Sequence, residues 1–466
     1  MVFSTPVFMF WFLVLTLGIY FVVPRKFRNL VLLVSSLFFY YWGEQEYVLI
    51  MFLSTVIDFT HGLLVERYKE AGRITAAKVV VGSSIFFNLL LLVFFKYWDF
   101  LAGSLQAIGI NAPILGIHLP IGISFYTFQT MSYTVDVYRG DTRAQRSILN
   151  FGTFVTLFPQ LIAGPIIKYK DLGDQIDART TSADKFASGV QIFMVGLAKK
   201  LLIANNVGML WDSYKALAPE QLTVAGAWLG VVAFSFQLYF DFSGYSDMAT
   251  GLGRMFGFEF MANFNYPYIS KSITEFWRRW HISLSTWFRE YLYIPLGGNR
   301  CSKGRWVFNL LMVWAATGIW HGASWNYLLW GLYFFVLLMV EKFFLLERLK
   351  KAPDIVAHLY TLFFVLVSWA IFAIEDFGHL TAYLKVMFGL GGVSVVNSAF
   401  GYYLTSYLPI LLVAAVASTP LGVTVYRKLS PTGQKVACTL LVTAGLVVCT
   451  AYLVASTYNP FLYFRF

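Results

Sequence analysis

Two histidines lie in aromatic and polar surroundings within a sequence that is otherwise strongly apolar. His321 directly follows the apolar run 307–320, and His281 lies in a segment rich in tryptophan and arginine, residues 276–287. Imidazole is the side chain whose charge changes near neutral pH, and placing it against hydrocarbon costs hydration energy. We therefore predict that His321 is the catalytic general base of a membrane-embedded enzyme and that His281 is a second catalytic residue. A hydrogen-bonded structural histidine is the alternative for each.

The remaining histidines have surroundings that favour structural roles. They lie near predicted helix ends, where interfacial or hydrogen-bonded histidines are common. They are His61, His118, His358 and His379.

The composition places most of the chain in a lipid bilayer. Of its 466 residues, 58% are hydrophobic and only 13% are charged. Apolar stretches near the roughly 20-residue length that crosses a bilayer recur from end to end, and several contain glycine or proline. They cover residues 6–23, 30–42, 47–65, 77–97, 114–135, 150–167, 186–208, 223–242, 306–320, 324–343, 357–374, 403–420 and 434–456. We predict an all-α polytopic membrane protein with about 11–13 transmembrane or re-entrant helices.

Basic and acidic loops alternate in the manner of the positive-inside rule. Arg25 and Lys26 follow the first apolar run, whereas Glu44 and Glu46 follow the second. This order predicts a retained first helix, not a cleaved signal peptide, with the N-terminus outside a bacterial inner membrane. The same rule puts His321 toward the outer side.

Charge, cysteine content and segment lengths exclude several other classes of protein. The net charge of +11 is spread over loops, so a nucleic-acid-binding face is not expected. The three cysteines have no spacing typical of a zinc site or a disulfide framework, and we expect no metal site. Because no segment predicts a soluble domain, we predict one integral-membrane domain over residues 1–466, with a central catalytic region at about 120–335.

Residues 239–305 mix polar and aromatic side chains more densely than a lipid-facing helix tolerates. Residues 272–275 have the pattern of a capping box, and the aromatic residues after them recur at helical spacing. This predicts an amphipathic helix that lies along the interface or lines a cavity. Residues 297–300, Gly-Gly-Asn-Arg, predict a tight turn.

Two aspartates of this region, Asp241 and Asp247, lie close to Tyr239 beside an apolar stretch. A buried carboxylate is tolerated only when it is paired, so we expect both to pair with Arg, Tyr or helix-terminal amides. They would form a structural polar network that holds neighbouring basic residues. Lys199 and Lys200 either mark a cytoplasmic helix end, which we favour, or attract a phosphate-bearing donor.

Glycine and proline interrupt the apolar runs at residues 120–125 and 163–165. Such breaks occur where backbone faces a protein-lined cavity or where a helix kinks, and both interpretations stay open. The glycine-rich segment 251–257 has the wrong spacing for a phosphate loop, so we interpret it as helix packing.

Several long motifs, in order along the chain, are similar to those of the membrane-bound O-acyltransferase superfamily. They are residues 239–248 (YFDFSGYSDM), 276–287 (FWRRWHISLSTW), 318–322 (GIWHG) and the terminal 459–466 (NPFLYFRF). Within the superfamily, the chain most resembles the alginate-type polysaccharide O-acetyltransferases, including the opening residues 1–4 (MVFS) and residues 138–142 (YRGDT).

This resemblance implies a helical funnel through the bilayer, with the superfamily histidine, His321, at its narrow waist and the second family histidine at His281. It implies transfer of an acetyl group from a cytoplasmic thioester, acetyl-CoA, to an extracytoplasmic polysaccharide, with alginate as the first choice. A periplasmic acetyltransferase with a Ser-His-Asp site is the expected partner, and no bound cofactor is expected.

We expect further substrate contacts from residues around the two histidines, namely Trp277, Arg278, Arg279, Trp280, Ser285, Asn299 and Trp320. Three alternative functions stay open. They are a D-alanyl transferase for teichoic acid, a peptidoglycan O-acetyltransferase, and a transporter of the acyl donor or the polymer.

Overall fold

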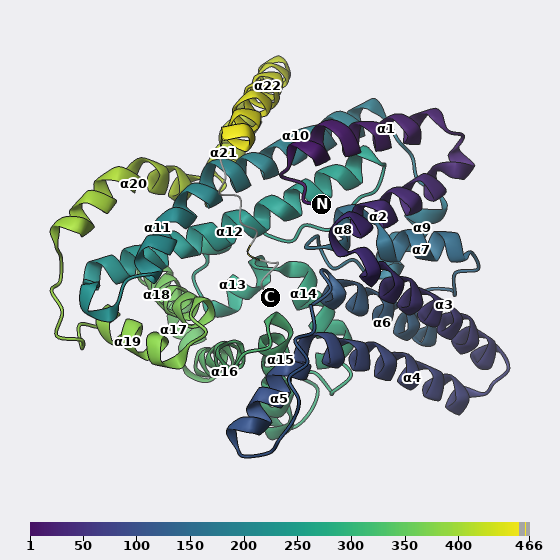
Figure 1. Cartoon of the computed structure of the whole chain (residues 1–466), viewed down its shortest axis with the longest axis horizontal. Helices are drawn as coiled ribbons and strands as arrows, with labels where there is room; N and C mark the ends of the chain where they lie inside the picture. The colour runs from purple at the N-terminus through teal and green to yellow at the C-terminus, as the bar shows by residue number, and fades with distance from the viewer. Residues whose placement is uncertain (456–461, 463–466) are drawn as a thin grey trace. The chain divides into compact units, whose positions relative to one another are not determined.

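The structure, a computed structural model, describes residues 1–455 and residue 462 (Figure 1). All regular secondary structure in this part of the chain is helical, which confirms the all-α prediction. The terminal motif 459–466 lies outside the described residues except for Leu462.

Eight helical runs in the described part of the chain are long and apolar enough to cross a membrane, which confirms a polytopic membrane protein. They are Arg25–Glu70, Ile74–Ala107, Ala183–Lys215, Val224–Met255, Trp325–Lys351, Asp354–Ala373, Ser398–Ala417 and Pro431–Ala455. The run Arg25–Glu70 contains two of the apolar stretches seen in the sequence. The stretches outside the eight runs form shorter or more polar helices; they are residues 6–23, 114–135, 150–167 and 306–320.

The chain divides into two compact units, which are described separately. Unit 1 comprises residues 1–193 and 245–261, and unit 2 comprises residues 194–244 and 262–466. Helices α10 (Ala183–Ala198) and α12 (Val224–Met255) each continue along the chain from one unit into the other. The single-domain boundaries stay a prediction.

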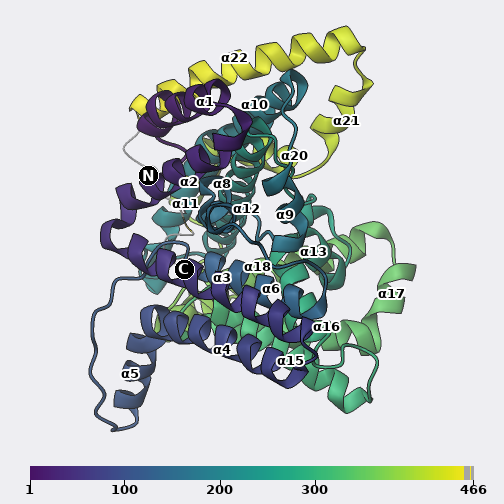
Figure 2. The ribbon, with the colours of Figure 1, turned by 90° about the vertical axis from the view of Figure 1, so that its right-hand side faces the viewer.

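Unit 1 contains the N-terminal helices. They are η1 (Val7–Phe12), α1 (Leu13–Val22), η2 (Arg25–Phe27), α2 (Arg28–Glu44), η3 (Gln45–Tyr47), α3 (Val48–Glu70), α4 (Ile74–Leu92), η4 (Val93–Tyr97), α5 (Trp98–Ala107), α6 (Ile123–Arg139), α7 (Ile148–Thr156), α8 (Phe158–Leu161) and α9 (Tyr169–Asp177). Helices α3, α4 and α6 pack against one another, and Figures 1 and 2 show α3 and α4 side by side.

A buried polar network joins α3, α4 and α6. The Asp58 carboxylate accepts hydrogen bonds from Ser84 Oγ at 2.5 Å and from Asn88 Nδ2 at 2.7 Å. Thr130 Oγ1 in turn donates to Asn88 Oδ1 at 3.1 Å, and Thr134 lies 3.1 Å from Ser84 Oγ. In an apolar surrounding such bonds replace those to water, so the network ties the three helices together.

Both predicted breaks in unit 1 are present. Gly122 adopts a left-handed φ of 78° just before α6 begins, and a Cβ there would lie only 2.7 Å from the Leu161 carbonyl oxygen at the end of α8. Gly164 similarly approaches the backbone of Gln160 too closely for a larger residue. Glycine is therefore required for the approach of these two non-helical segments.

The glycine-rich segment 251–257 is helix packing, as the sequence predicts. A Cβ on Gly251 would lie 2.6 Å from the carbonyl oxygen of Gly189, where α12 packs on α10 within unit 1. Small residues allow this backbone contact.

Unit 2 contains the remaining helices. They are η5 (Lys199–Ala204), α11 (Asn205–Lys215), η6 (Pro219–Gln221), η7 (Pro267–Ile269), α13 (Ile273–Arg279), α14 (Ile282–Phe288), η8 (Arg289–Tyr293), α15 (Lys303–His321), α16 (Trp325–Val340), η9 (Glu341–Leu345), α17 (Leu346–Lys351), α18 (Asp354–Ala373), α19 (Phe377–Met387), α20 (Ser398–Ala417), α21 (Leu421–Lys428) and α22 (Pro431–Ala455).

Helices α15 and α16 form a tight hairpin in unit 2, visible side by side in Figure 1. A Cβ on Gly318 would overlap with the Tyr327 carbonyl oxygen, and one on Gly331 would overlap with the Trp314 carbonyl oxygen. A Cβ on Gly322 would overlap with the Tyr327 ring. The glycines around His321 thus let the two helices meet closely, and this fixes the end of α15 that carries the histidine.

Candidate functional site

His321 is the last residue of α15 and is only 4% exposed. Three aromatic rings pack nearly perpendicular to its imidazole, with centroids 5.0 to 5.5 Å away. We call these rings the aromatic cage: Trp320, Trp330 and Phe372. Side chains cover the imidazole in this conformation, so the passages that substrates need stay a prediction.

Asn326 holds one wall of the aromatic cage. It is fully buried, and its Nδ2 donates to the carbonyl oxygens of Ile371 at 3.2 Å and Phe372 at 3.0 Å. The start of α16 is thereby tied to the end of α18, which places Phe372 against His321. Sequence reasoning missed Asn326, although a single amide at the start of a strongly apolar run was an available signal.

His281 lies at a break that the sequence did not predict. The expected continuous amphipathic helix is instead two short helices, α13 and α14, because Trp280 is extended and His281 adopts a left-handed φ of 43°. The loop residue Asn263 stabilises the break: its carbonyl oxygen accepts from Ile282 N at 2.9 Å, and its Oδ1 accepts from Ser283 Oγ at 2.9 Å. These bonds replace the helical bonds that the break removes.

The side chain of His281 caps the second helix. Its Nδ1 accepts a hydrogen bond from Leu284 N at 3.3 Å. In a neutral imidazole the proton then resides on Nε2, which makes Nε2–H a donor. Burial lowers the pKa of His281 to about 3, so the ring stays neutral at physiological pH.

Trp320 links the two histidines. Its ring centroid lies 5.9 Å from that of His281 and 5.1 Å from that of His321. The ring of Phe242, from α12, also packs on His281, with the two ring centroids 4.7 Å apart. Both imidazoles therefore belong to one aromatic cluster of unit 2.

Helix α13 is anchored by a carboxylate that sequence reasoning missed. Glu341 is fully buried, and its carboxylate accepts from the backbone N–H groups of Ile273 at 2.5 Å and Thr274 at 2.9 Å. A carboxylate is favourable at a helix N-terminus, where backbone N–H groups are unpaired. The predicted capping box is half formed: Ser272 Oγ accepts from the backbone N–H of Glu275.

The structure divides the predicted substrate contacts into two groups. Trp277, Trp280 and Trp320 are buried, and the first two pack in the same core cluster as Trp330. The others lie outside this cluster. Arg278 and Asn299 are exposed, Arg279 pairs with Glu275 at 2.8 Å, and Ser285 is half-buried.

The predicted turn at 297–300 is present. Gly297 and Gly298 both have positive φ, and the Gly298 carbonyl oxygen accepts from Asn309 Nδ2 at 3.0 Å. The turn therefore connects η8 to α15 with its polar groups paired.

Asp241 is paired, but its charged partner is a lysine and not an arginine. Its carboxylate lies 2.7 Å from Lys200 Nζ, and both side chains are only 2% exposed. Lys200 Nζ also donates to Asn205 Oδ1 at 2.9 Å, and Leu462 N donates to Asp241 Oδ2 at 2.9 Å. Interpreting Lys200 as a helix end was wrong, because it lies within the helical run Ala183–Lys215. The ion pair compensates its burial.

The two other members of the predicted network lie on the same helix, α12. Tyr239 is buried, and its ring packs on those of Tyr268 at 5.3 Å and Trp280 at 6.1 Å. Asp247 is half-buried in the part of α12 that belongs to unit 1.

The remaining predicted structural histidines have polar neighbours. His61 lies 2.7 Å from the Ile57 carbonyl oxygen and 2.9 Å from Ser83 Oγ. His358 Nδ1 lies 3.1 Å from the Ser270 carbonyl oxygen, and His118 lies 3.7 Å from Glu44. The backbone N–H of His379 donates to the carboxylate of Asp376.

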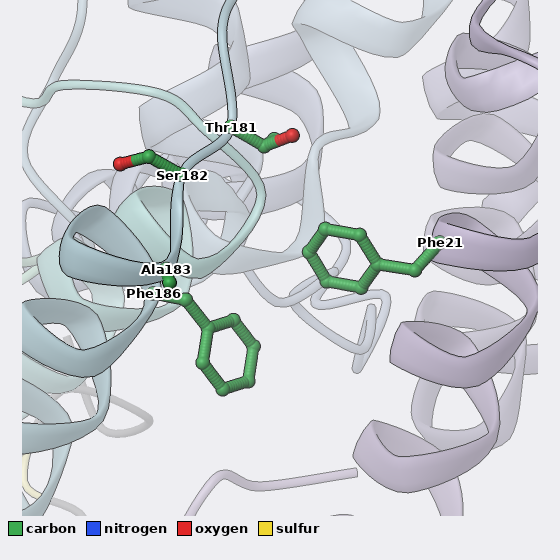
Figure 3. Close-up of a pocket in the computed structure, with 5 residues that line it drawn as sticks. All are labelled: Phe21, Thr181, Ser182, Ala183 and Phe186. Carbon is green, nitrogen blue, oxygen red and sulfur yellow. The ribbon is translucent and has the colours of Figure 1, made fainter.

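A surface cavity in unit 1 lies between α1 and the start of α10 (Figure 3). Figure 3 shows the rings of Phe21 and Phe186 on its walls, with the hydroxyls of Thr181 and Ser182 nearby. None of its lining residues is an acid, a base or a thiol. Among the described residues, no group of three or more His, Cys, Asp or Glu could hold a metal ion.

Comparisons with a family profile and with individual proteins indicate the same family. The sequence profile of the MBOAT, membrane-bound O-acyltransferase, family matches residues 141–348. The chain is 45% identical to the probable alginate O-acetylase of Azotobacter vinelandii, over 84% of this chain and 79% of that protein. It is 40% identical to the probable alginate O-acetylase of Pseudomonas putida over the full length of both. It is 34% identical to the peptidoglycan O-acetyltransferase of Helicobacter pylori, over 85% of this chain and 81% of that protein.

Proposed function

Because this chain belongs to the membrane-bound O-acyltransferase family and is an O-acyltransferase, we propose that it supplies acetyl groups for the O-acetylation of alginate. The donor is a cytoplasmic thioester, acetyl-CoA, and the acetyl group leaves on the extracytoplasmic side of the inner membrane. A periplasmic acetyltransferase with a Ser-His-Asp site completes transfer to the polymer.

The observation that carries this proposal is the setting of His321. A buried imidazole ends α15 inside an aromatic cage, and a second, neutral histidine contacts the same tryptophan. A dry aromatic surrounding strengthens hydrogen bonds and excludes the water that would hydrolyse a thioester. The identity to proteins named alginate O-acetylases supports the choice of polymer.

In the proposed reaction His321 is the general base. It takes the proton of an acceptor hydroxyl while the hydroxyl oxygen forms a bond to the thioester carbonyl carbon, and the carbonyl electron pair moves to oxygen. The tetrahedral intermediate then collapses: the C–S bond breaks, the new ester remains, and the leaving thiolate takes the proton from His321. Such proton transfer typically contributes about 10²- to 10⁴-fold to the rate.

His281 takes no proton in this scheme. Its pKa of about 3 keeps it neutral, and its Nδ1 is occupied by Leu284 N, so its contribution is the Nε2–H donor. A fixed donor in a dry site binds the donor thioester or stabilises developing negative charge. Trp277, Trp280 and Trp320 form the apolar walls around the acyl group.

The orientation in the membrane is part of the proposal. The N-terminus lies outside, and the alternation of basic and acidic loops supports this arrangement. Donor and acceptor then reach His321 from opposite sides, which makes acetyl transfer vectorial.

The test uses purified protein in phospholipid vesicles with labelled acetyl-CoA on the cytoplasmic face. With acetyl-CoA as the donor, labelled acetyl ester should appear on the acceptor. With an acylated D-alanyl carrier as the donor, no acyl ester should appear on the acceptor. Transfer from the D-alanyl carrier instead would identify a D-alanyl transferase.

A strain carrying His321→Ala separates catalysis from transport. Catalysis predicts that the polymer is still secreted but lacks O-acetyl groups. Lost secretion of a polymer that is still acetylated would instead identify a transporter.

A second candidate function, peptidoglycan O-acetylation, is favoured by the identity to the Helicobacter pylori protein. Deleting the chain's gene should remove acetyl esters from alginate and leave those of muramic acid unchanged. The reverse pattern would select the second candidate.

A further inference from the structure

The indole N–H of Trp330 is an unpaired donor beside the catalytic imidazole. Trp330 is 1% exposed, and its Nε1 has no hydrogen-bond partner among the described residues. Its ring lies perpendicular to that of His321, with the centroids 5.0 Å apart. The donor is therefore buried in the aromatic cage.

An unpaired buried donor is costly, since it has lost its hydrogen bond to water, and a phenylalanine would fill such a space without that cost. Two indoles elsewhere in the chain show the paired state. Trp228 Nε1 donates to the Met387 carbonyl oxygen at 2.8 Å, and Trp306 Nε1 donates to Tyr293 Oη at 3.0 Å. An unpaired donor at a functional site calls for a partner that arrives with the substrate.

The neighbouring indole of Trp277 also lacks a hydrogen-bond partner, and its ring centroid lies 5.6 Å from that of Trp330. The ring contacts of Trp277 are with Phe276, Trp314, Trp330 and Phe334. Trp330, by contrast, packs directly on His321. A carbonyl carbon attacked by a hydroxyl that is hydrogen-bonded to His321 must lie within a few ångströms of the imidazole. Trp330 is the better placed of the two donors.

We propose that Trp330 is a catalytic residue whose indole N–H donates a hydrogen bond to the thioester carbonyl oxygen and stabilises the oxyanion. This inference rests on the proposed acetyl transfer. As the hydroxyl oxygen bonds to the carbonyl carbon, its proton passes to His321 and the π pair moves to the carbonyl oxygen, which Trp330 binds. When the C–S bond breaks, the pair returns to re-form the carbonyl, and the thiolate leaves with the proton from His321.

A fixed donor of this kind acts mainly in the transition state, because the hydrogen bond strengthens as charge develops on the oxygen. Removing one such donor typically lowers kcat by about 10²- to 10³-fold. The aromatic ring itself contributes packing that a phenylalanine retains in part. The two contributions can therefore be separated.

The experiment compares Trp330→Phe with the matched variant Trp228→Phe in vesicles with labelled acetyl-CoA. Trp330→Phe should lower kcat by about 10²-fold or more, with KM for acetyl-CoA and the midpoint of the pH profile unchanged. The smaller ring loses packing as well as the N–H, so the melting temperature of each variant is measured beside its kcat. Trp228→Phe, which loses a formed hydrogen bond, should keep kcat and melt at a lower temperature.

An unchanged kcat in Trp330→Phe would overturn the inference. If Trp330→Phe does not fold, benzothienylalanine at position 330 replaces the N–H by sulfur in a ring of nearly the same shape. Full activity of that variant overturns the inference, and a loss of kcat with unchanged KM supports it. Failure of wild-type protein to use acetyl-CoA would refute the proposed function, an outcome distinct from an active Trp330→Phe.

Discussion

The Asp58 network of unit 1 and the aromatic cage of unit 2 use buried polar groups in opposite ways. In the Asp58 network of unit 1, the carboxylate and the Asn88 amide are hydrogen-bonded to side chains from three helices. In the aromatic cage of unit 2, the Trp330 indole N–H is buried with no partner among the described residues. Both regions bury polar atoms away from water, but only one satisfies them.

We interpret this difference as one between structural burial and the catalytic burial proposed above. Satisfied polar groups stabilise one arrangement of helices, and removing one leaves its partners unpaired. Unsatisfied groups reduce stability in the free protein and gain their partner from the substrate. Four changes to the protein test this contrast.

The largest effect on stability is expected at the ion pair of unit 2, because a satisfied pair there should behave like the unit 1 network. Lys200→Met leaves Asp241 buried without its cation and should lower the free energy of unfolding by about 3–5 kcal/mol. The matched change Lys350→Met removes the exposed partner of Glu347 and should leave the free energy of unfolding nearly unchanged. Denaturant titration in detergent measures both, and equal losses would contradict this account.

Asp58→Ala breaks the unit 1 network. It leaves the Ser84 hydroxyl and the Asn88 amide without their main acceptor, and should cost about 2–4 kcal/mol. The kcat of the folded fraction should not change, since the network carries no chemistry. A lower kcat at full folding would place Asp58 in the reaction and remove the contrast between the units.

Gly318→Ala tests the hairpin that presents His321. The added methyl group meets backbone atoms of Tyr327 and Leu328, which cannot turn aside, so a loss near 3 kcal/mol, at the upper end of overpacking effects, is expected. Gly304→Ala on the same helix is the control, because nothing lies within 4 Å of its Cβ. It should be neutral or slightly stabilising. Equal melting temperatures for the two variants would show that close packing at Gly318 does not position His321.

The buried neutral state of His281 gives a pH dependence of stability. Burial lowers its pKa from the ordinary 6.5 to about 3, so below pH 6.5 the unfolded chain binds a proton that the folded protein does not. Stability should therefore fall as the pH decreases from 6.5, by about 2 kcal/mol at a pH near 5. His281→Gln should lack this part of the slope. Parallel curves for the two proteins would show that His281 ionises normally in the fold.

The fold class, and the position of His321 at the end of an apolar helix, could be predicted from the sequence. Long apolar stretches leave little choice but membrane helices, and a histidine at the end of one of them is conspicuous. The pairing of Asp241 followed from the cost of an unpaired carboxylate, although its partner Lys200 lies 41 positions earlier and was assigned to a helix end.

The break at His281 could not be predicted, because the aromatic residues continue at helical spacing across it. What decides the break is Asn263, a residue distant in sequence that supplies the missing hydrogen bonds. The role of Glu341 could not be predicted either. Its partners are the backbone N–H groups of α13, and every residue type except proline has such a group, so the sequence does not identify them. Trp330 was one aromatic residue among many, and it is distinguished only by its contact with His321 together with its unpaired N–H.

The most direct test of the central claim is the single-turnover rate of acetyl transfer by His321→Ala at saturating acetyl-CoA. If His321 is the general base, the rate should fall by about 10²- to 10⁴-fold and lose its dependence on pH, while acetyl-CoA binding persists. A rate equal to that of the wild type, with the same pH dependence, would contradict the claim that His321 takes the proton.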